Sequence, residues 1–180
     1  MTHRVHFYNV GTAKQFIMIF ALVGCLSSSV SGASDQPANC RVTPKFSSRD
    51  RIADAVIEAI QHTENRITLA LYGFNNTKLA DELAKLAKRK VVVRLKVDTA
   101  KSSEKKTTRL IETLKTAGVQ IQPVAADGRN HNKFAIIDDT RVLTGSYNWT
   151  EKAESNWENL LILDCPELAK SYEAEWERIR

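Results

Sequence analysis

The chain has 180 residues, of which 43% are hydrophobic and 26% are charged, with a formal net charge of +5 and a pI near 9.2. This length is sufficient for one domain with a real hydrophobic core, so length and composition exclude a small fold that depends on disulfides. The mild basic excess is compatible with an anionic partner but does not establish one.

The first 33 residues have the pattern of an export signal. A basic start precedes the apolar run FIMIFALVGCL at 16–26, which is short for a bilayer span. Two cleavage sites compete: the small-x-small sequence at 31–33, and LVGC at 22–25, which resembles a bacterial lipoprotein box with Cys25 as the lipidated residue. An uncleaved membrane anchor is the third alternative. All three predict an exported domain, either periplasmic or lipid-anchored to the bacterial membrane.

Residues 34–46, which contain two prolines, are expected to form a linker to a domain over 47–180. After processing, Cys40 and Cys165 remain, and an oxidising compartment would allow them to pair. Closing so long a loop would stabilise the fold by roughly 4–5 kcal/mol. Two unpaired buried thiols are the alternative. No spacing in the sequence predicts a zinc site, and we expect neither a metal nor a cofactor.

Hydrophobic spacing predicts the elements of the domain in chain order. The first half should form three helices, within 47–65, at 77–90 and at 104–117. Ser47 or Ser48 should cap the first helix, the NNT at 75–77 should cap the second, and the third should stop at Gly118. Strands are expected between and after these helices, at 66–73, 91–97 and 119–124. Strands that alternate with amphipathic helices are typical of a layered α/β domain.

The second half predicts a hairpin of strands 133–138 and 141–146 joined at Asp139 and Thr140, then a strand at 158–164 and a helix at 166–180 opened by Pro166. The whole pattern predicts an α/β fold, a layered α-β-α sandwich around a mixed central sheet.

The stretch HNKFAIIDDTRVLTGSYN, residues 131–148, places polar groups around an apolar run. On a strand, His131 and Lys133 share one face and Asp138 lies on the other. The first two can therefore meet one ligand, while Asp138 should support the site without doing the chemistry. Ser146 and Asn148 add a hydroxyl and an amide, which suit phosphate oxygens.

A histidine beside a lysine suits phosphoryl transfer. Neutral imidazole is a competent nucleophile near pH 7, and an ammonium group neutralises charge on the phosphate oxygens in the transition state. An acid partner on the other imidazole nitrogen would set the tautomer, and Glu158 is the expected partner.

The pattern His131-x-Lys133-x4-Asp138-x6-Gly145-Ser146-x-Asn148 resembles the signature of the phospholipase D superfamily. The element order from about 45 to 178 is similar to its small, single-motif bacterial endonuclease branch. The resemblance implies a phospholipase D/nuclease-like fold and metal-independent phosphodiester hydrolysis through a covalent phosphohistidine.

Carried onto this chain, the resemblance implies a catalytic set of His131, Lys133, Asp138 and Glu158. His131 would be the nucleophile that attacks the phosphorus. Asp138 would have a structural or supporting role, and Glu158 would orient His131. Lys133, Ser146 and Asn148 would bind the phosphate.

The family mechanism uses two histidines, one that attacks and one that protonates the leaving oxygen, and this chain has one motif copy. His62 has no nearby lysine partner and is interpreted as a solvated histidine at a helix end. The resemblance therefore implies a two-fold homodimer with His131 of both copies at the interface.

The motif does not choose between nucleic acid and lipid. Residues 78–109 carry eleven Lys or Arg against four Asp or Glu, which could follow a nucleic-acid backbone or simply form a solvated helix face. Tyr147 and Trp149 could stack on a base or pack internally. We expect a non-specific endonuclease acting on DNA, with RNA as a further substrate. A phospholipase D acting on phosphatidyl headgroups is the alternative, and a non-catalytic nucleic-acid-binding module is the third.

Overall fold

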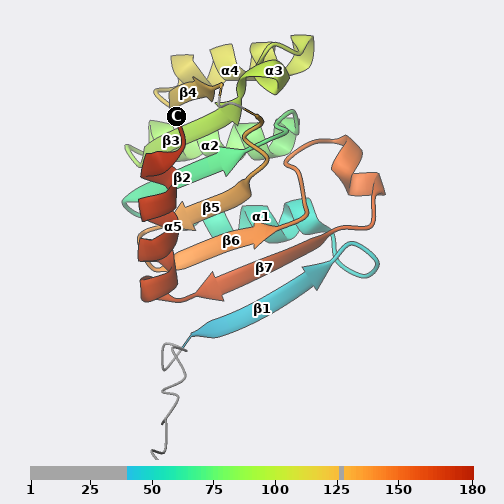
Figure 1. Ribbon diagram of the computed structural model, residues 1–180, viewed down its shortest axis with the longest axis vertical. Coiled ribbons are helices and arrows are strands. Elements are labelled where there is room, and N and C mark those ends of the chain that lie inside the picture. Colours follow the sequence, from blue (N-terminus) through green and yellow to red (C-terminus); the bar gives the residue numbers. More distant parts are fainter. Residues whose placement is uncertain (1–39, 126–127) are drawn as a thin grey trace, which may run out of the picture. The chain divides into compact units, whose positions relative to one another are not determined.

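Seven strands form one mixed sheet in the order β1-β7-β6-β5-β2-β3-β4 (Figure 1). A computed structural model describes residues 40–125 and 128–180, so the expected export signal and its cleavage sites lie outside the described residues. β2, β3 and β4 run parallel, and the other neighbours are antiparallel. The strands are β1 (Arg41–Phe46), β2 (Arg66–Leu71), β3 (Val92–Asp98), β4 (Gln120–Val124), β5 (Lys133–Ile137), β6 (Arg141–Gly145) and β7 (Asn159–Asp164).

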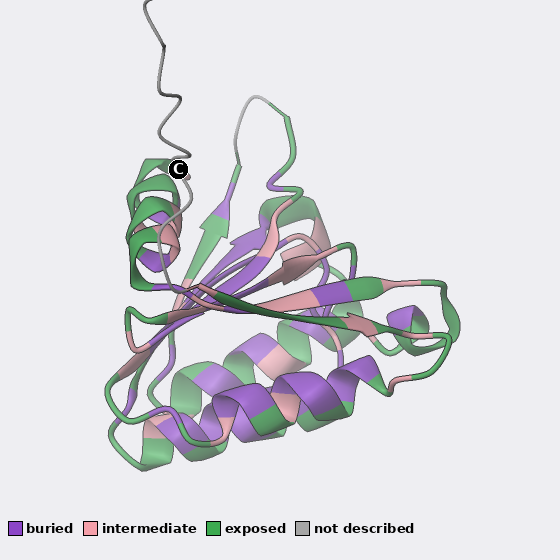
Figure 2. Ribbon diagram, turned by 90° about the horizontal axis from the view of Figure 1, so that it is seen from below, coloured by how far each residue is buried: buried purple, intermediate pink, exposed green. Residues whose placement is uncertain are grey.

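Helices lie on both faces of this sheet, as Figures 1 and 2 show. The helices are α1 (Ile52–Ile60), α2 (Thr77–Lys88), α3 (Thr99–Ser102), α4 (Lys105–Thr116), α5 (Pro166–Arg178) and the 3-10 helix η1 (Lys152–Ser155). Buried residues of α1, α2 and α4 form one core cluster with the sheet, and α5 forms a second cluster on the opposite face. The predicted layered α-β-α sandwich with a mixed sheet is confirmed. Among the described residues, every helix is too short or too polar to cross a bilayer.

α2 follows its sequence pattern closely. Asn76 caps it, because its side chain accepts a hydrogen bond from the Leu79 amide at 3.3 Å. α1 differs from the prediction, since it begins at Ile52 and neither Ser47 nor Ser48 caps it. Ser47 instead bonds a segment near the end of the chain, as described below for the site.

α5 is held to the sheet by buried and paired cations. Lys96 Nζ donates to the carbonyl oxygens of Trp176 and Ile179, both at 2.8 Å, and lies 3.8 Å from the centre of the Trp176 ring. Burial lowers the pKa of Lys96. Arg94 pairs with Glu173 and Glu177. Part of the basic segment 78–109 therefore stabilises the fold and is not available to a substrate.

The expected linker 34–46 is wrong over Arg41–Phe46, which forms β1 at one edge of the sheet, antiparallel to β7. Residues 34–39 lie outside the described part. Pro44 made this segment look irregular, but a proline is tolerated in an outer strand because only one side of the strand is paired. The opposite outer strand, β4, also contains a proline, Pro123.

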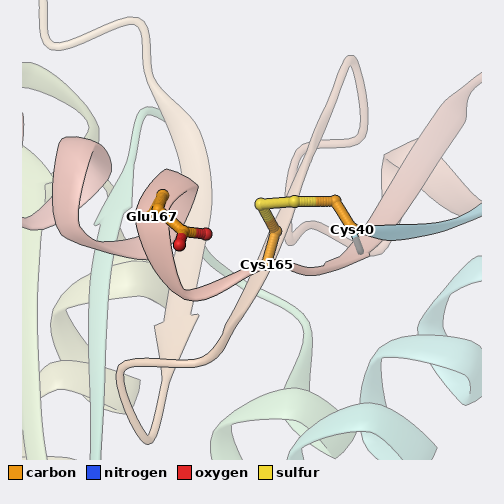
Figure 3. A group of neighbouring side chains, drawn as sticks. All are labelled: Cys40, Cys165 and Glu167. Atoms are coloured by element: carbon orange, nitrogen blue, oxygen red, sulfur yellow. A yellow bond between two sulfur atoms is a disulfide. The ribbon is translucent and has the colours of Figure 1, made fainter. Parts of the chain in front are cut away.

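A disulfide joins Cys40, just before β1, to Cys165, just before α5 (Figure 3). The Cα atoms of the two cysteines are 4.7 Å apart. The bridge therefore ties the outer strand β1 to the turn that follows its neighbour β7, and of the two alternatives left open for these cysteines the structure has the disulfide.

The β5–β6 hairpin turns at Asp138 and Asp139, one residue earlier than predicted. Both have left-handed backbones, with φ of 46° and 57°, and the Thr140 amide donates to the Ile137 carbonyl at 3.1 Å. Positive φ at both central residues gives a turn whose twist matches that of a hairpin. Asp138 thus leaves the strand on which the sequence pattern placed it.

Candidate active site

His131 and Lys133 lie together where β5 begins, in the middle of the sheet between β2 and β6. His131 is exposed and Lys133 is half-buried. Lys133 Nζ donates to the His131 carbonyl at 2.8 Å and lies 3.3 Å from His131 Nδ1. Burial lowers the pKa of Lys133, while the charge of Glu158 acts in the opposite direction. The predicted pair therefore forms, and it faces solvent.

Tyr72, which directly follows β2, is a residue of this region that the sequence interpretation missed. Its ring lies 4.5 Å from the His131 ring, centre to centre. Its hydroxyl is 3.1 Å from Arg129 Nη1, and the Nζ atoms of Lys101 and Lys133 lie 5.5 Å and 5.4 Å from its ring centre. The signal that could have identified Tyr72 from the sequence is its position at the end of a predicted strand that pairs with the motif strand.

Glu158 and Ser146 also lie together, because β6 ends where β7 begins. Ser146 Oγ donates to Glu158, which also accepts from Asn156 Nδ2 at 3.1 Å. Ser146 Oγ accepts from the Asn159 amide at 3.0 Å. Among the described residues, the hydrogen bonds of the Glu158 carboxylate come from Ser146 and Asn156, and the expected contact with His131 is not formed. Lys133 lies beside His131 Nδ1 instead.

Ser47 fixes the backbone that carries Glu158. Its Oγ accepts from the Glu158 amide and donates to the Asn156 carbonyl, both at 2.8 Å. The Ser47 amide donates to the Glu158 carbonyl at 3.0 Å. Three hydrogen bonds therefore link the end of β1 to the segment 156–158. Sequence reasoning missed this role because the two segments are more than 100 residues apart in the chain.

Asn148 lies on the loop after β6, between two buried aromatic residues. Its Oδ1 is buried without a hydrogen-bond partner and packs near Gly73. The atom of the Asn148 side chain that can bind a phosphate is therefore Nδ2, which donates a hydrogen bond. Tyr147 and Trp149 are each 1% exposed, so they pack internally and do not offer a stacking surface for a base. Burial raises the pKa of Tyr147, whose hydroxyl donates to Glu154.

Asp138, for which a supporting role without chemistry was expected, lies at the opposite end of β5 from His131. Its carboxylate accepts from the amides of Glu64, Asn65 and Arg66 at 2.9, 2.8 and 3.0 Å. Burial would raise the pKa of Asp138, but the three amide bonds outweigh it and hold the pKa below its usual value. Asp138 therefore connects the β5–β6 turn to the start of β2.

His62 and the disulfide lie away from this region. His62 is exposed after α1 and lines a hollow with Arg141 and Asp164, at the end of β6 and β7 opposite to Ser146 and Glu158. Within the described residues, Cys40, Cys165 and Glu167 come close enough together to hold a metal (Figure 3). The two sulfurs are bonded to each other, so they do not offer thiolate ligands.

The family of the chain follows from comparison with known proteins. A family model described as cardiolipin synthase, PLD-like domain matches residues 56–180. The chain belongs to this family, and therefore to the phospholipase D superfamily that its motif resembles.

Individual relatives are similar over different lengths. A mitochondrial cardiolipin hydrolase of Xenopus laevis is 38% identical over 121 residues, which are 64% of this chain and 55% of that protein. The chain thus spans about half the length of that relative. A phospholipase D of Rickettsia prowazekii is 29% identical over 178 residues, 95% of this chain and 80% of that protein.

Among solved structures, the phospholipase D family member Nuc from Salmonella typhimurium aligns with a TM-score of 0.75 at 24% identity. The alignment covers 78% of this chain and 94% of Nuc. At that identity the likeness concerns the fold, and it confirms the expected phospholipase D-like architecture.

Proposed function

We propose that this chain is a phosphodiester hydrolase in which His131 is the nucleophile. The observation that carries the proposal is an exposed imidazole with an ammonium group 3.3 Å from its Nδ1, at the start of a central strand. Family membership supports the same reaction class. The reaction does not need a metal ion, because imidazole attacks phosphorus directly and Lys133 supplies the positive charge.

The proposed reaction has two steps, transfer of the phosphoryl group to His131 and hydrolysis of the phosphohistidine. A nitrogen of His131 attacks the phosphorus, a P–N bond forms, and the P–O bond to the leaving group breaks. A second imidazolium gives its proton to the leaving oxygen. Water then attacks the phosphohistidine, loses a proton to the second imidazole, and releases the phosphate ester with free His131. Lys133 and the amide nitrogen of Asn148 would hold the phosphate oxygens throughout.

The second imidazole in this proposal is His131 of a second copy of the chain. The other histidine in the described part of the chain, His62, lies at the far end of the sheet. A two-fold axis near β5 would place two copies of His131 on either side of one phosphate. Each site would then be complete only in the dimer.

Nucleic acid is the substrate we infer first, DNA and also RNA. Lys101, Arg129 and Lys133 surround Tyr72 beside an exposed histidine, and an open cationic site suits a polyanion. In this proposal, binding weakens steeply as salt increases, because phosphate contacts release counterions.

A phospholipid is the second candidate substrate, and two observations favour it. Trp157, next to Glu158, is 90% exposed, and Phe46 on the neighbouring strand β1 is 41% exposed. Exposed aromatic side chains suit the boundary between lipid and water. The names of two relatives, cardiolipin hydrolase and phospholipase D, point in the same direction.

We also propose that the protein is exported, to the periplasm or as a lipid-anchored protein. The Cys40–Cys165 disulfide supports this, because disulfides persist in oxidising compartments. Mass spectrometry of the N-terminus of the protein recovered from cells tests the proposal, and an unprocessed chain in the cytosol would contradict it.

The deciding experiment is cleavage of supercoiled plasmid in excess EDTA by wild type, His131→Ala and the matched control His62→Ala. We expect wild type and the control to cut and His131→Ala to be inactive. Sedimentation at the assay concentration should show a dimer. An active monomer would refute the shared site.

Other outcomes separate the alternatives. If no variant cuts plasmid, the same proteins are tested on cardiolipin and phosphatidylcholine vesicles, where release of headgroups by wild type alone supports the lipid substrate. Binding of DNA without hydrolysis of any phosphodiester would support a non-catalytic binding module. Equal activity of His131→Ala and wild type would refute the nucleophile.

A further inference from the structure

Three cationic side chains converge on Tyr72, and the proposed reaction uses one of them. Lys133 binds the scissile phosphate in that proposal, whereas Lys101 and Arg129 lie elsewhere around the ring. Lys101 comes from α3 and Arg129 from the segment before His131. The chain thus brings two remote segments to one aromatic ring that also packs against His131.

These cations are only partly neutralised. Lys101 pairs with Glu104 at 2.6 Å, at the surface. Within the described residues, Arg129 and Lys133 have no ion pair with a carboxylate. Placing three like charges around one ring costs repulsion, which an anionic ligand would relieve. The cluster carries more positive charge than one phosphodiester needs.

A cavity of about 310 Å³ adjoins the cluster, with Tyr72 and Lys101 in its wall. Asn148, which is a phosphate-binding residue in the proposed function, also forms part of its wall. Lys101 and Lys152 supply charge to it, and the remaining polar lining comes from Asn75, Glu104, Thr150 and Asn156. Such a lining fits a hydroxylated, phosphorylated group better than an acyl chain.

We propose that Lys101 and Arg129 form a subsite for a second phosphate of the substrate, next to the scissile one. The inference rests on the proposed function. Tyr72 would lie between the two phosphates, with Lys133 on one side and the subsite on the other. The subsite would select substrates in which two phosphates are close together along one chain.

Two substrate classes share this chemistry. In DNA and RNA, successive phosphodiesters are joined through three sugar carbons. In cardiolipin, two phosphodiesters are joined through the three carbons of a glycerol. A single-phosphate lipid such as phosphatidylcholine lacks the second group. The subsite would therefore bind either candidate substrate of the proposed function, because each carries a second phosphate three carbons from the first.

The test compares substrates with one and two phosphates on the full chain. The nucleotide arm uses the dinucleotide TpT and the trinucleotide TpTpT, and the lipid arm uses phosphatidylglycerol and cardiolipin vesicles at equal surface charge. The measured quantity is the ratio of kcat/KM for the two-phosphate substrate to that for the one-phosphate substrate. TpTpT and cardiolipin each carry two scissile phosphodiesters, so the ratio is about two without a subsite, and the arm in which it clearly exceeds two identifies the source of the second phosphate.

We expect Lys101→Ala and Arg129→Ala each to lower this ratio about tenfold to hundredfold, the range for a hydrogen bond to a charged group. Lys115→Ala is the matched control, because Lys115 also forms an i,i+3 pair with an exposed glutamate, Glu112. The control should leave the ratio unchanged.

Each contrary result has one meaning. A ratio of two or less for wild type in both arms overturns the subsite while the proposed hydrolysis stands. An equal decrease in Lys115→Ala overturns it too, since general charge would then explain the effect. If wild type hydrolyses no diester, the proposed function fails. The subsite is then judged by whether Lys101→Ala weakens binding of TpTpT more than binding of TpT.

Discussion

Replacing Asp138 with Asn should destabilise the fold and leave the chemistry intact. The carboxylate accepts three backbone amides, two on Oδ1 and one on Oδ2. Asn tolerates the left-handed backbone, with φ of 46°, but exchanges one acceptor oxygen for a donor that faces an amide. A hydrogen bond to a charged group contributes about 1.5–3 kcal/mol, so we expect a loss of about 2–3 kcal/mol in the free energy of unfolding.

Urea denaturation and thermal unfolding measure the loss, which should lower the Tm by roughly 5–10 °C. Asp139→Asn is the matched control. Asp139 lies in the same turn with φ of 57°, but its partner is the partly exposed Arg66, and such surface pairs contribute about 0–1 kcal/mol.

The pH dependence has a definite sign. The pKa of Asp138 is lowered in the folded state, so its stabilisation is fully present above the unfolded pKa of about 3.9 and is lost as pH falls through the folded pKa. Wild type and Asp138→Asn should therefore differ most near neutral pH and converge in acid. Unchanged stability of Asp138→Asn, or a hundredfold lower kcat per folded molecule, would refute the structural role.

Two further predictions concern residues that hold the edge of the sheet. Replacing Cys40 and Cys165 with Ser should lower the free energy of unfolding by about 4–5 kcal/mol, because the bridge spans a sequence separation of 125 residues. Urea denaturation with and without reductant checks this, and no effect of reductant on wild type would contradict it. Ser47→Ala should lower the free energy of unfolding by about 1–3 kcal/mol, because its Oγ makes two hydrogen bonds to the segment 156–158. Urea denaturation checks this against Ser48→Ala, and equal stability of the two variants would contradict it.

Local patterns predicted most of the fold. The spacing of Leu79, Leu83 and Leu86, with a cap at Asn76, is a local property, and α2 forms where it indicates. The order of strands and helices likewise indicated the layers. β1 was missed because its stability comes from pairing with β7 and from a disulfide to a distant residue. Neither interaction leaves a periodic signal in six residues.

The candidate site was predicted in part for the same reason. His131 and Lys133 are two residues apart, so their contact follows from the chain itself. Tyr72 and Ser47 reach the region only through pairing of remote strands and loops. The alternation that put Asp138 on a strand ignored the turn, where three amides from the start of β2 determine its position.

The prolines of the two outer strands limit how copies of this chain can assemble. Pro44 in β1 and Pro123 in β4 each interrupt the row of amide donors that a flat, unpaired edge would offer to another sheet. Growth of the sheet from one molecule into the next is disfavoured at both ends. Two copies that share a phosphate, as proposed above, would therefore meet through side chains, on a face or at the His131 end of the strands, and the same prolines disfavour edge-to-edge aggregation.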